Sequence, residues 1–115
     1  PYHLVLVGAG AGLPYEERVI ALPYERDPRQ VARIIASCDA FVHANDKEPF
    51  GLIVLEAMAC GRPVVGVNAG GVAETVNESV GQLARSADPD DYAQAIEALF
   101  ARDTEALGAA ARVHT

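Results

Sequence analysis

Two carboxylates, Glu48 and Glu56, are the residues whose type and spacing best suit the binding of a hydroxylated ligand. Seven residues separate them, and both belong to the segment EPFGLIVLEAMACGRPVVGVNAGG, which spans residues 48–71. Apart from Glu56, residues 52–60 are apolar, which predicts a helix that is buried on all sides. A buried carboxylate is costly unless it is paired. We therefore expect Glu56 either to have a cationic partner or to face a cavity and bind a ligand hydroxyl.

A helix and a strand must position these carboxylates. We expect the helix to begin at Gly51 and to end near Cys60, with Gly61 as the left-handed residue after the last turn. The β-branched residues within 64–67 then predict a short strand, which ends in the small residues 69–71. The segment therefore reads as loop, helix, strand and loop.

The backbone at both ends of this segment suits a diphosphate. Gly51, Leu52 and Ile53 would present free amide groups at a helix N-terminus, where the helix dipole also favours anions. Gly70 and Gly71 would allow another backbone to approach closely. Together these groups predict an anion site beside the two glutamates.

The two glutamates would complete such a site. Glu56 lies about one turn into the helix, where its carboxylate could accept hydrogen bonds from a ribose diol. Glu48 precedes the helix and could bind the hydroxyl groups of a sugar. Each glutamate also has a structural alternative. Glu48 could be an ordinary acidic residue of a loop, and Glu56 could pair with Arg62 or Arg33 in the core. Taken singly, the structural roles are the more frequent outcome.

The rest of the chain alternates strands with helices. The expected strands are residues 3–7, 18–22, 40–43, 64–67 and 81–84, and the expected helices are residues 29–38, 51–60, 72–77, 92–101 and 104–113. The first strand is a continuous apolar run, which predicts burial on both faces. The alternation predicts an α/β fold, a three-layer Rossmann-like parallel sheet with helices on both faces. Because such sheets bind ligands beyond the carboxyl ends of their strands, the loops at 8–12, 44–51 and 68–71 should share one ligand edge.

The glycine-rich turn GAGAG offers a second hypothesis. Gly8, Gly10 and Gly12 follow a predicted strand, as in the fingerprint of NAD- and FAD-binding folds. However, Leu13 stands where the third glycine should be, and the next strand arrives by Val19, which leaves too little chain for the crossover helix. We therefore favour a plain tight turn and keep a dinucleotide-binding module as the alternative.

The composition limits the classes of protein to which this chain can belong. With 115 residues, half of them apolar, the chain suits a single folded domain over residues 1–115. The net charge of −7 argues against a partner nucleic acid or an anionic membrane surface. No apolar run approaches the roughly 20 residues of a membrane span.

The cysteines and histidines show no metal-ligand spacing, so we expect no metal. Cys38 and Cys60 lie in helix-like apolar contexts, which predicts buried free thiols and a cytoplasmic location. We interpret His3, His43 and His114 as structural. Of the three histidines, His43 has the strongest case for a functional role, because it ends a strand at the expected ligand edge.

The segment SCDAFVHANDKEPFGLIVLEAMACGRPVVGVNAGGVAETV, residues 37–76, resembles the signature region of retaining glycosyltransferase family 4, which has the GT-B fold. Two glutamates separated by seven residues match that family's motif. The EPFG opening, the EAMA-C-G-x-PVV run and the GG-x-x-E segment that ends at Glu74 match as well. The flanking sequence matches more loosely.

The resemblance implies that the chain is part of a C-terminal, nucleotide-sugar (donor) binding domain. Glu48 would contact the hydroxyls of the donor sugar, as the candidate catalytic residue, and Glu56 would contact the ribose. Backbone amides would hold the diphosphate or the sugar at Phe50, Gly51, Leu52 and Ile53. The reaction would transfer a glycosyl unit from a nucleotide sugar, such as a UDP- or GDP-hexose, with retention of configuration and with no essential metal or other cofactor.

The chain also departs from the family pattern. An Arg and a Lys that usually neutralise the diphosphate lie upstream of the first residue here, and the acceptor-binding N-terminal domain is absent. We therefore expect a fragment of a longer transferase that binds phosphate weakly and is inactive by itself. A truncated sheet would expose an edge and an apolar face, which favours a homo-oligomer. A non-catalytic scaffold domain is the third hypothesis.

Overall fold

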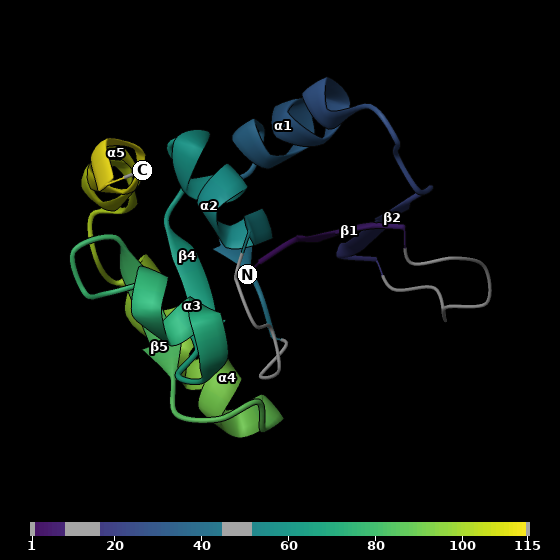
Figure 1. Ribbon diagram of the computed structural model, residues 1–115. Helices are drawn as coiled ribbons and strands as arrows, with labels where there is room; N and C mark the ends of the chain where they lie inside the picture. Colours follow the sequence, from purple (N-terminus) through teal and green to yellow (C-terminus); the bar gives the residue numbers. More distant parts are fainter. Residues whose placement is uncertain (1, 9–16, 45–51, 115) are drawn as a thin grey trace. The chain divides into compact units, whose positions relative to one another are not determined.

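The computed structural model describes residues 2–8, 17–44 and 52–114 (Figure 1). The chain divides into two compact units, residues 1–31 and 32–115. Helix α1 (Pro28–Ala36) contains the boundary between them. The Asp27 carboxylate accepts a hydrogen bond from the Arg29 amide at 3.0 Å, so Asp27 caps this helix.

The first unit contains a parallel pair of strands, β1 (Leu4–Val7) and β2 (Val19–Leu22). The expectation that β1 is buried on both faces is wrong. Leu4 is 39% exposed and Val7 40%, and Ile20 of β2 is 48% exposed. The physical reason is that side chains leave a sheet perpendicular to the pairing direction, so two paired strands cannot cover each other's faces.

The second unit contains a three-stranded parallel sheet in the order β3–β4–β5. Its strands are β3 (Phe41–Val42), β4 (Val64–Val67) and β5 (Gly81–Ala84). The register pairs Val42 with Val65 and Val64 with Gly81. All four residues of the central strand β4 are buried. This agrees with its sequence, because a nearly continuous run of valines is typical of a parallel strand covered on both faces.

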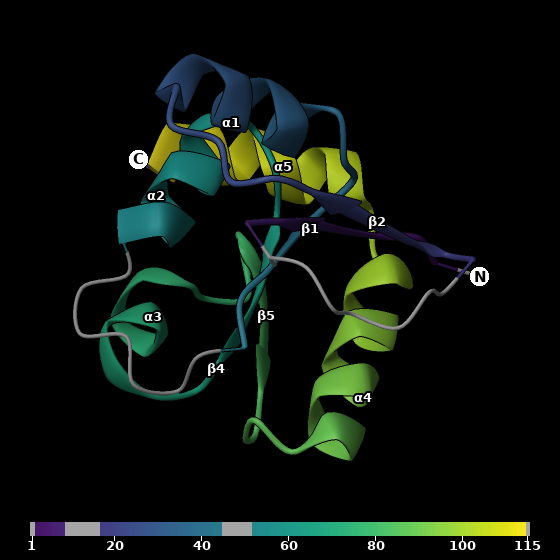
Figure 2. The same cartoon turned by 90° about the vertical axis from the view of Figure 1, so that its right-hand side faces the viewer.

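Helices cover both faces of this sheet, and Figure 2 shows α3 (Gly70–Thr75) and α4 (Pro89–Phe100) on opposite sides of β4 and β5. The core on the α4 side consists of Val65, Ala84, Ala95, Leu99 and Leu107. On the other side, a Cβ added at Gly66 would lie 2.5 Å from Val72 Cγ1, so α3 packs directly onto the glycine backbone of β4. The expected three-layer α/β architecture is confirmed for this unit.

Two further helices, α2 (Leu52–Ala59) and α5 (Thr104–His114), pack against each other. Helix α2 ends as the sequence predicts. The Gly61 amide bonds to Met58 O at 2.9 Å and the Arg62 amide to Ala57 O at 3.3 Å, while Gly61 has φ +76°. This is a Schellman motif, which requires a left-handed residue and therefore favours glycine.

Other local expectations need small corrections. Helix α3 begins at Gly70 rather than at residue 72 and ends at Thr75, because the backbone at Val76 is extended (φ −94°, ψ 121°). Cys38 and Cys60 are free thiols, as expected, but they are partly buried rather than fully buried.

Candidate functional site

The carboxyl ends of β3 and β4 form one edge of the sheet in the second unit. His43 follows β3, and residues 68–71 follow β4. The Asn68 amide bonds to Ala84 O at 2.9 Å, which extends the ladder between β4 and β5 at this edge. In parallel sheets with helices on both faces, ligands bind at this end of the strands.

The structure describes only some of the residues that the sequence predicts for the site. Glu48, Phe50 and Gly51 lie outside the described residues, so their roles stay predictions. Leu52 is the first residue of α2 and is 62% exposed, whereas Ile53 is half-buried.

Glu56 is exposed, and the expectation that it lies on a helix buried on all sides is wrong. Helix α2 buries Val54, Ala57 and Met58 on one stripe, and its exposed residues 52, 56 and 59 follow the helical spacing on the opposite stripe. The sequence did not reveal this because the exposed stripe also contains Leu52 and Ala59 beside the glutamate. Because both stripes of α2 contain apolar residues, the sequence does not show which stripe is buried. That depends on which segments of the fold cover the helix.

The structural alternative for Glu56, an ion pair in the core with Arg62 or Arg33, is not seen in the described ranges. Arg62 instead donates from Nη2 to Ala36 O, at the end of α1. Within the described ranges, the Glu56 carboxylate forms no ion pair with Arg62 or Arg33. The carboxylate is therefore free to accept hydrogen bonds from a ligand.

The two glycines after β4 differ in their surroundings. Gly70 has φ +59° and is exposed, so its backbone conformation favours glycine and its surface is open. Gly71 is buried, directly before Val72, which packs on Gly66. A ligand can therefore approach the protein backbone closely at Gly70, whereas Gly71 is covered.

A hydrogen-bonded junction at Val65 was missed by the sequence analysis. Val65 O accepts from the His43 amide at 2.9 Å and from the Tyr92 hydroxyl at 2.7 Å. Burial raises the pKa of Tyr92 to about 12, against a smaller opposite effect of the His43 backbone amide. Tyr92 lies on the expected apolar face of α4, but the periodicity could not show that its hydroxyl reaches a strand carbonyl 27 residues earlier.

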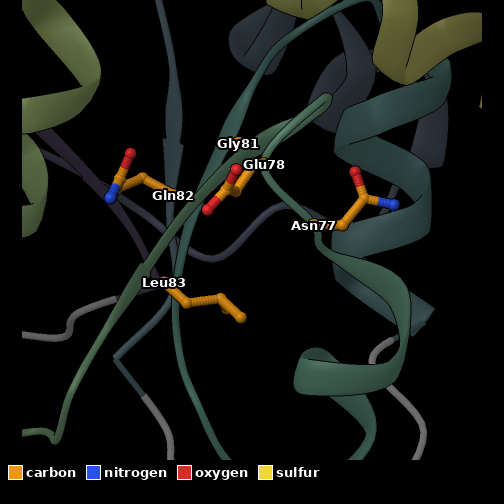
Figure 3. A pocket seen from close by; sticks show the side chains of 5 residues that line it. All are labelled: Asn77, Glu78, Gly81, Gln82 and Leu83. Atoms are coloured by element: carbon orange, nitrogen blue, oxygen red, sulfur yellow. The ribbon is translucent and has the colours of Figure 1, made fainter.

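A shallow hollow of about 160 Å³ lies at the opposite end of the sheet, beside the start of β5 (Figure 3). Its lining residues are Asn77, Glu78, Gly81, Gln82 and Leu83. Arg102 donates to Gly81 O at 2.9 Å and to Gln82 Oε1 at 3.2 Å. These bonds occupy Gly81 O and Gln82 Oε1. The hollow lies at the amino end of β5, which separates it from the candidate ligand edge.

Two searches of the described residues were negative. Among residues 2–8, 17–44 and 52–114, no three His, Cys, Asp or Glu side chains come together in a way that could hold a metal ion. In the same part of the chain, no helix is both long and apolar enough to cross a membrane.

The layered parallel sheet and its carboxyl edge define the class of protein. It is an α/β protein of the doubly wound type, with its candidate site beyond the ends of β3 and β4. The family is defined by comparison with known proteins. Residues 1–102 match the family model described as glycosyl transferases group 1, and the chain belongs to this family.

The relatives are glycosyltransferases. The chain is 47% identical over 79 residues to D-inositol 3-phosphate glycosyltransferase from Geodermatophilus obscurus, an alignment that covers 68% of this chain and 17% of that protein. It is 36% identical over 108 residues to N-acetyl-alpha-D-glucosaminyl L-malate synthase from Bacillus anthracis, covering 84% of this chain and 28% of that one. The chain therefore spans between 17% and 28% of the lengths of these two relatives.

Solved structures confirm the expected fold. Sucrose-phosphate synthase from Thermosynechococcus elongatus has a TM-score of 0.78 and 33% identity, covering 85% of this chain and 25% of that one. Anabaena HepE in complex with UDP and glucose has a TM-score of 0.72 and 33% identity, covering 85% and 27%. The C-terminal domain of a group 1 glycosyl transferase family protein from Francisella tularensis shares the fold at 21% identity, with a TM-score of 0.69. The chain thus corresponds to a portion of the C-terminal domain of a GT-B fold.

Proposed function

We propose that this chain is part of the donor-binding domain of a retaining glycosyltransferase, which transfers a glycosyl unit from a nucleotide-diphosphate sugar to an acceptor. The observation that carries the proposal is the Glu56 carboxylate, which is exposed on α2 and forms no ion pair among the described residues. An exposed carboxylate one turn into a helix suits a ribose diol. The family and the HepE complex with UDP and glucose support a nucleotide-sugar donor.

The remaining roles follow from the motif. Glu48 would bind the hydroxyls of the donor sugar, and the backbone from Phe50 to Ile53 would hold the diphosphate. Gly70 would let the ligand approach the end of β4, where its exposed backbone has φ +59°. Backbone amides would stabilise the charge of the leaving nucleotide diphosphate, and we expect no metal to be required.

Two further parts of the proposal concern the protein as a whole. Because the chain spans so little of its relatives' lengths, we expect the isolated 115 residues to bind nucleotide without transferring sugar. The two free thiols favour a cytoplasmic location.

The test compares Glu56→Gln with Glu97→Gln, which changes another exposed glutamate, on α4. Binding of UDP, GDP, ADP and NAD would be measured by calorimetry, with a thermal melt of each variant. We expect one nucleoside diphosphate to bind, and Glu56→Gln to weaken it about tenfold or more, as for the loss of a hydrogen bond to a charged group. Glu97→Gln should bind like the wild type, and both melts should be unchanged.

Three results would contradict the proposal. Equal affinity in the wild type and Glu56→Gln would exclude the ribose contact. A loss of about 3–5 kcal/mol in unfolding free energy in Glu56→Gln would instead indicate a buried ion pair. Binding of NAD in place of the diphosphates would favour the dinucleotide-binding alternative at Gly8, Gly10 and Gly12, of which the structure describes only Gly8.

A further inference from the structure

The geometry points to His43 as a second donor-contacting residue. We propose that its Nδ1 atom forms a hydrogen bond with an oxygen of the bound nucleotide sugar. This inference rests on the proposed function and adds a residue for which the motif implies no role.

His43 is held firmly at the candidate ligand edge. It directly follows β3, and its amide donates to Val65 O at 2.9 Å. The Tyr92 hydroxyl donates to the same carbonyl at 2.7 Å. One carbonyl of β4 thus joins the end of β3 to α4, so the backbone from which the imidazole extends is fixed by two layers of the fold.

The imidazole has one nitrogen without a partner. Nδ1 of His43 is buried and accepts or donates no hydrogen bond in the described part of the chain. Buried polar atoms in folded proteins nearly always have a partner, either protein, water or ligand, because leaving them unpaired costs their full desolvation free energy. The partner of Nδ1 is therefore to be sought outside the described protein groups.

The nearest neighbours on the same face of the sheet are apolar or have no side chain. Strand alternation places Phe41 on this face, and its ring centroid lies 6.3 Å from that of His43 with a tilt of 32°. The parallel register places Gly66 opposite His43, one residue beyond the pair formed by Val42 and Val65. Neither of these two residues offers a side-chain hydrogen-bond partner for Nδ1.

The described residues contain one other buried side-chain nitrogen without a hydrogen-bond partner, and it lies at the opposite end of the sheet. It is Nε of Arg62, whose Nη2 already donates to Ala36 O at the end of α1. Arg62 precedes β4 and so lies at the amino end of that strand. Of these two described residues, His43 is the one whose unpartnered buried nitrogen lies at the carboxyl edge, where doubly wound sheets bind nucleotides.

A histidine nitrogen suits either part of a nucleotide sugar. A neutral imidazole can accept a hydrogen bond from a sugar hydroxyl or donate one to a phosphate oxygen, depending on its tautomer. Both oxygens belong to the same donor molecule. UDP and UDP-glucose distinguish a contact with the transferred sugar from the others, because only UDP-glucose carries the glucose hydroxyls, whereas both carry the ribose and the phosphates.

The test combines imidazole nitrogen NMR with three variants of the 115-residue chain. UDP and UDP-glucose would each be titrated into protein with ¹⁵N-labelled histidine. Asparagine places a polar atom where Nδ1 stands, whereas glutamine places one nearer to Nε2 and phenylalanine places none. His43→Asn should therefore bind like the wild type, while His43→Gln and His43→Phe should bind about three- to tenfold more weakly, as for one lost hydrogen bond. His114→Phe, at an exposed histidine, is the matched control and should not change binding.

Each outcome decides between the claims. A shift of the His43 Nδ1 resonance with UDP supports a phosphate or ribose contact, and a shift with UDP-glucose alone supports a sugar contact. If the wild type binds either ligand while the resonance is unmoved and His43→Phe binds equally well, the inference about His43 is wrong and the proposed function stands. If the wild type binds neither ligand nor any other nucleoside diphosphate, the proposed function fails and the inference with it. Should a variant fail to melt cooperatively, the wild-type resonance still gives the answer.

Discussion

Gly108, in the middle of α5, packs so closely against the end of α2 that a single substitution can test the contact. A Cβ added there would lie 2.1 Å from Gly61 O, 3.1 Å from Gly61 C and 3.4 Å from Pro63 Cδ. Gly61 is fixed by its Schellman motif, so its carbonyl oxygen cannot rotate away as a side chain would. Gly108→Ala therefore requires α5 to move by about an ångström or more away from the end of α2, since real Cβ atoms approach other atoms no closer than about 3 Å.

Two opposing effects set the magnitude. Replacing glycine by alanine inside a helix normally stabilises by up to about 1 kcal/mol. Overpacking against a rigid neighbour destabilises by about 1–3 kcal/mol. Because the clash is with backbone, we expect overpacking to win and Gly108→Ala to lower the free energy of unfolding by about 1–2 kcal/mol. For a unit of this size such a loss lowers Tm by about 4–16 °C.

Urea and thermal unfolding followed by circular dichroism would measure the change. Ala109→Gly is the matched control, because Ala109 is the exposed neighbour in the same helix. It should lose about 1 kcal/mol from helix propensity alone and so calibrates that effect in α5. If Gly108→Ala is instead as stable as the wild type or more stable, the close contact between α5 and Gly61 does not exist and the packing argument is refuted.

Two further changes test the junction at Val65 and the start of α5. Tyr92→Phe removes the hydroxyl that donates to Val65 O, and urea unfolding should show a loss of about 1 kcal/mol, since the carbonyl keeps its second donor. In the wild type, absorbance at 295 nm should show one tyrosine that ionises near pH 12, because burial raises the pKa of Tyr92 to about 12. The free energy of unfolding should fall as the pH rises from about 10 to 12, because tyrosine in the unfolded chain already ionises in this range while Tyr92 in the folded chain does not. Tyr92→Phe should lack this pH-dependent loss. Asp103→Ala removes the carboxylate that accepts from the Ala106 amide at 3.1 Å, and a melt should show a loss of about 1 kcal/mol, whereas an unchanged Tm would show that this cap contributes nothing.

The elements of the fold were predictable where the signal is local. Gly61 after an apolar helix predicted the end of α2, because only a residue that tolerates φ +76° suits a Schellman motif. The helix expected over residues 92–101 is α4, which begins three residues earlier, at Pro89, because proline lacks the amide that would be unsatisfied in the first turn. The valine run at residues 64–67 predicted a strand buried on both faces, and β4 is that strand.

The candidate site was predictable in part. The spacing of Glu48 and Glu56 and the glycines after β4 indicated the glycosyltransferase family, and the match over residues 1–102 confirms it. The setting of Glu56 was not predictable, because α2 has apolar residues on both its buried and its exposed stripe. The same limit applies to β1, where an apolar run suits a covered strand and an exposed one equally well.

The sequence by itself determined the family, the order of strands and helices along the chain, and the end of α2. These depend on backbone conformations and side-chain periods that extend over a few neighbouring residues. Only the tertiary structure decided that Glu56 faces outward, that Tyr92 reaches Val65 O, and that Nδ1 of His43 is buried without a partner among the described residues. The physical reason is that exposure and hydrogen-bond partners depend on which segments, distant in the sequence, cover each face of the sheet.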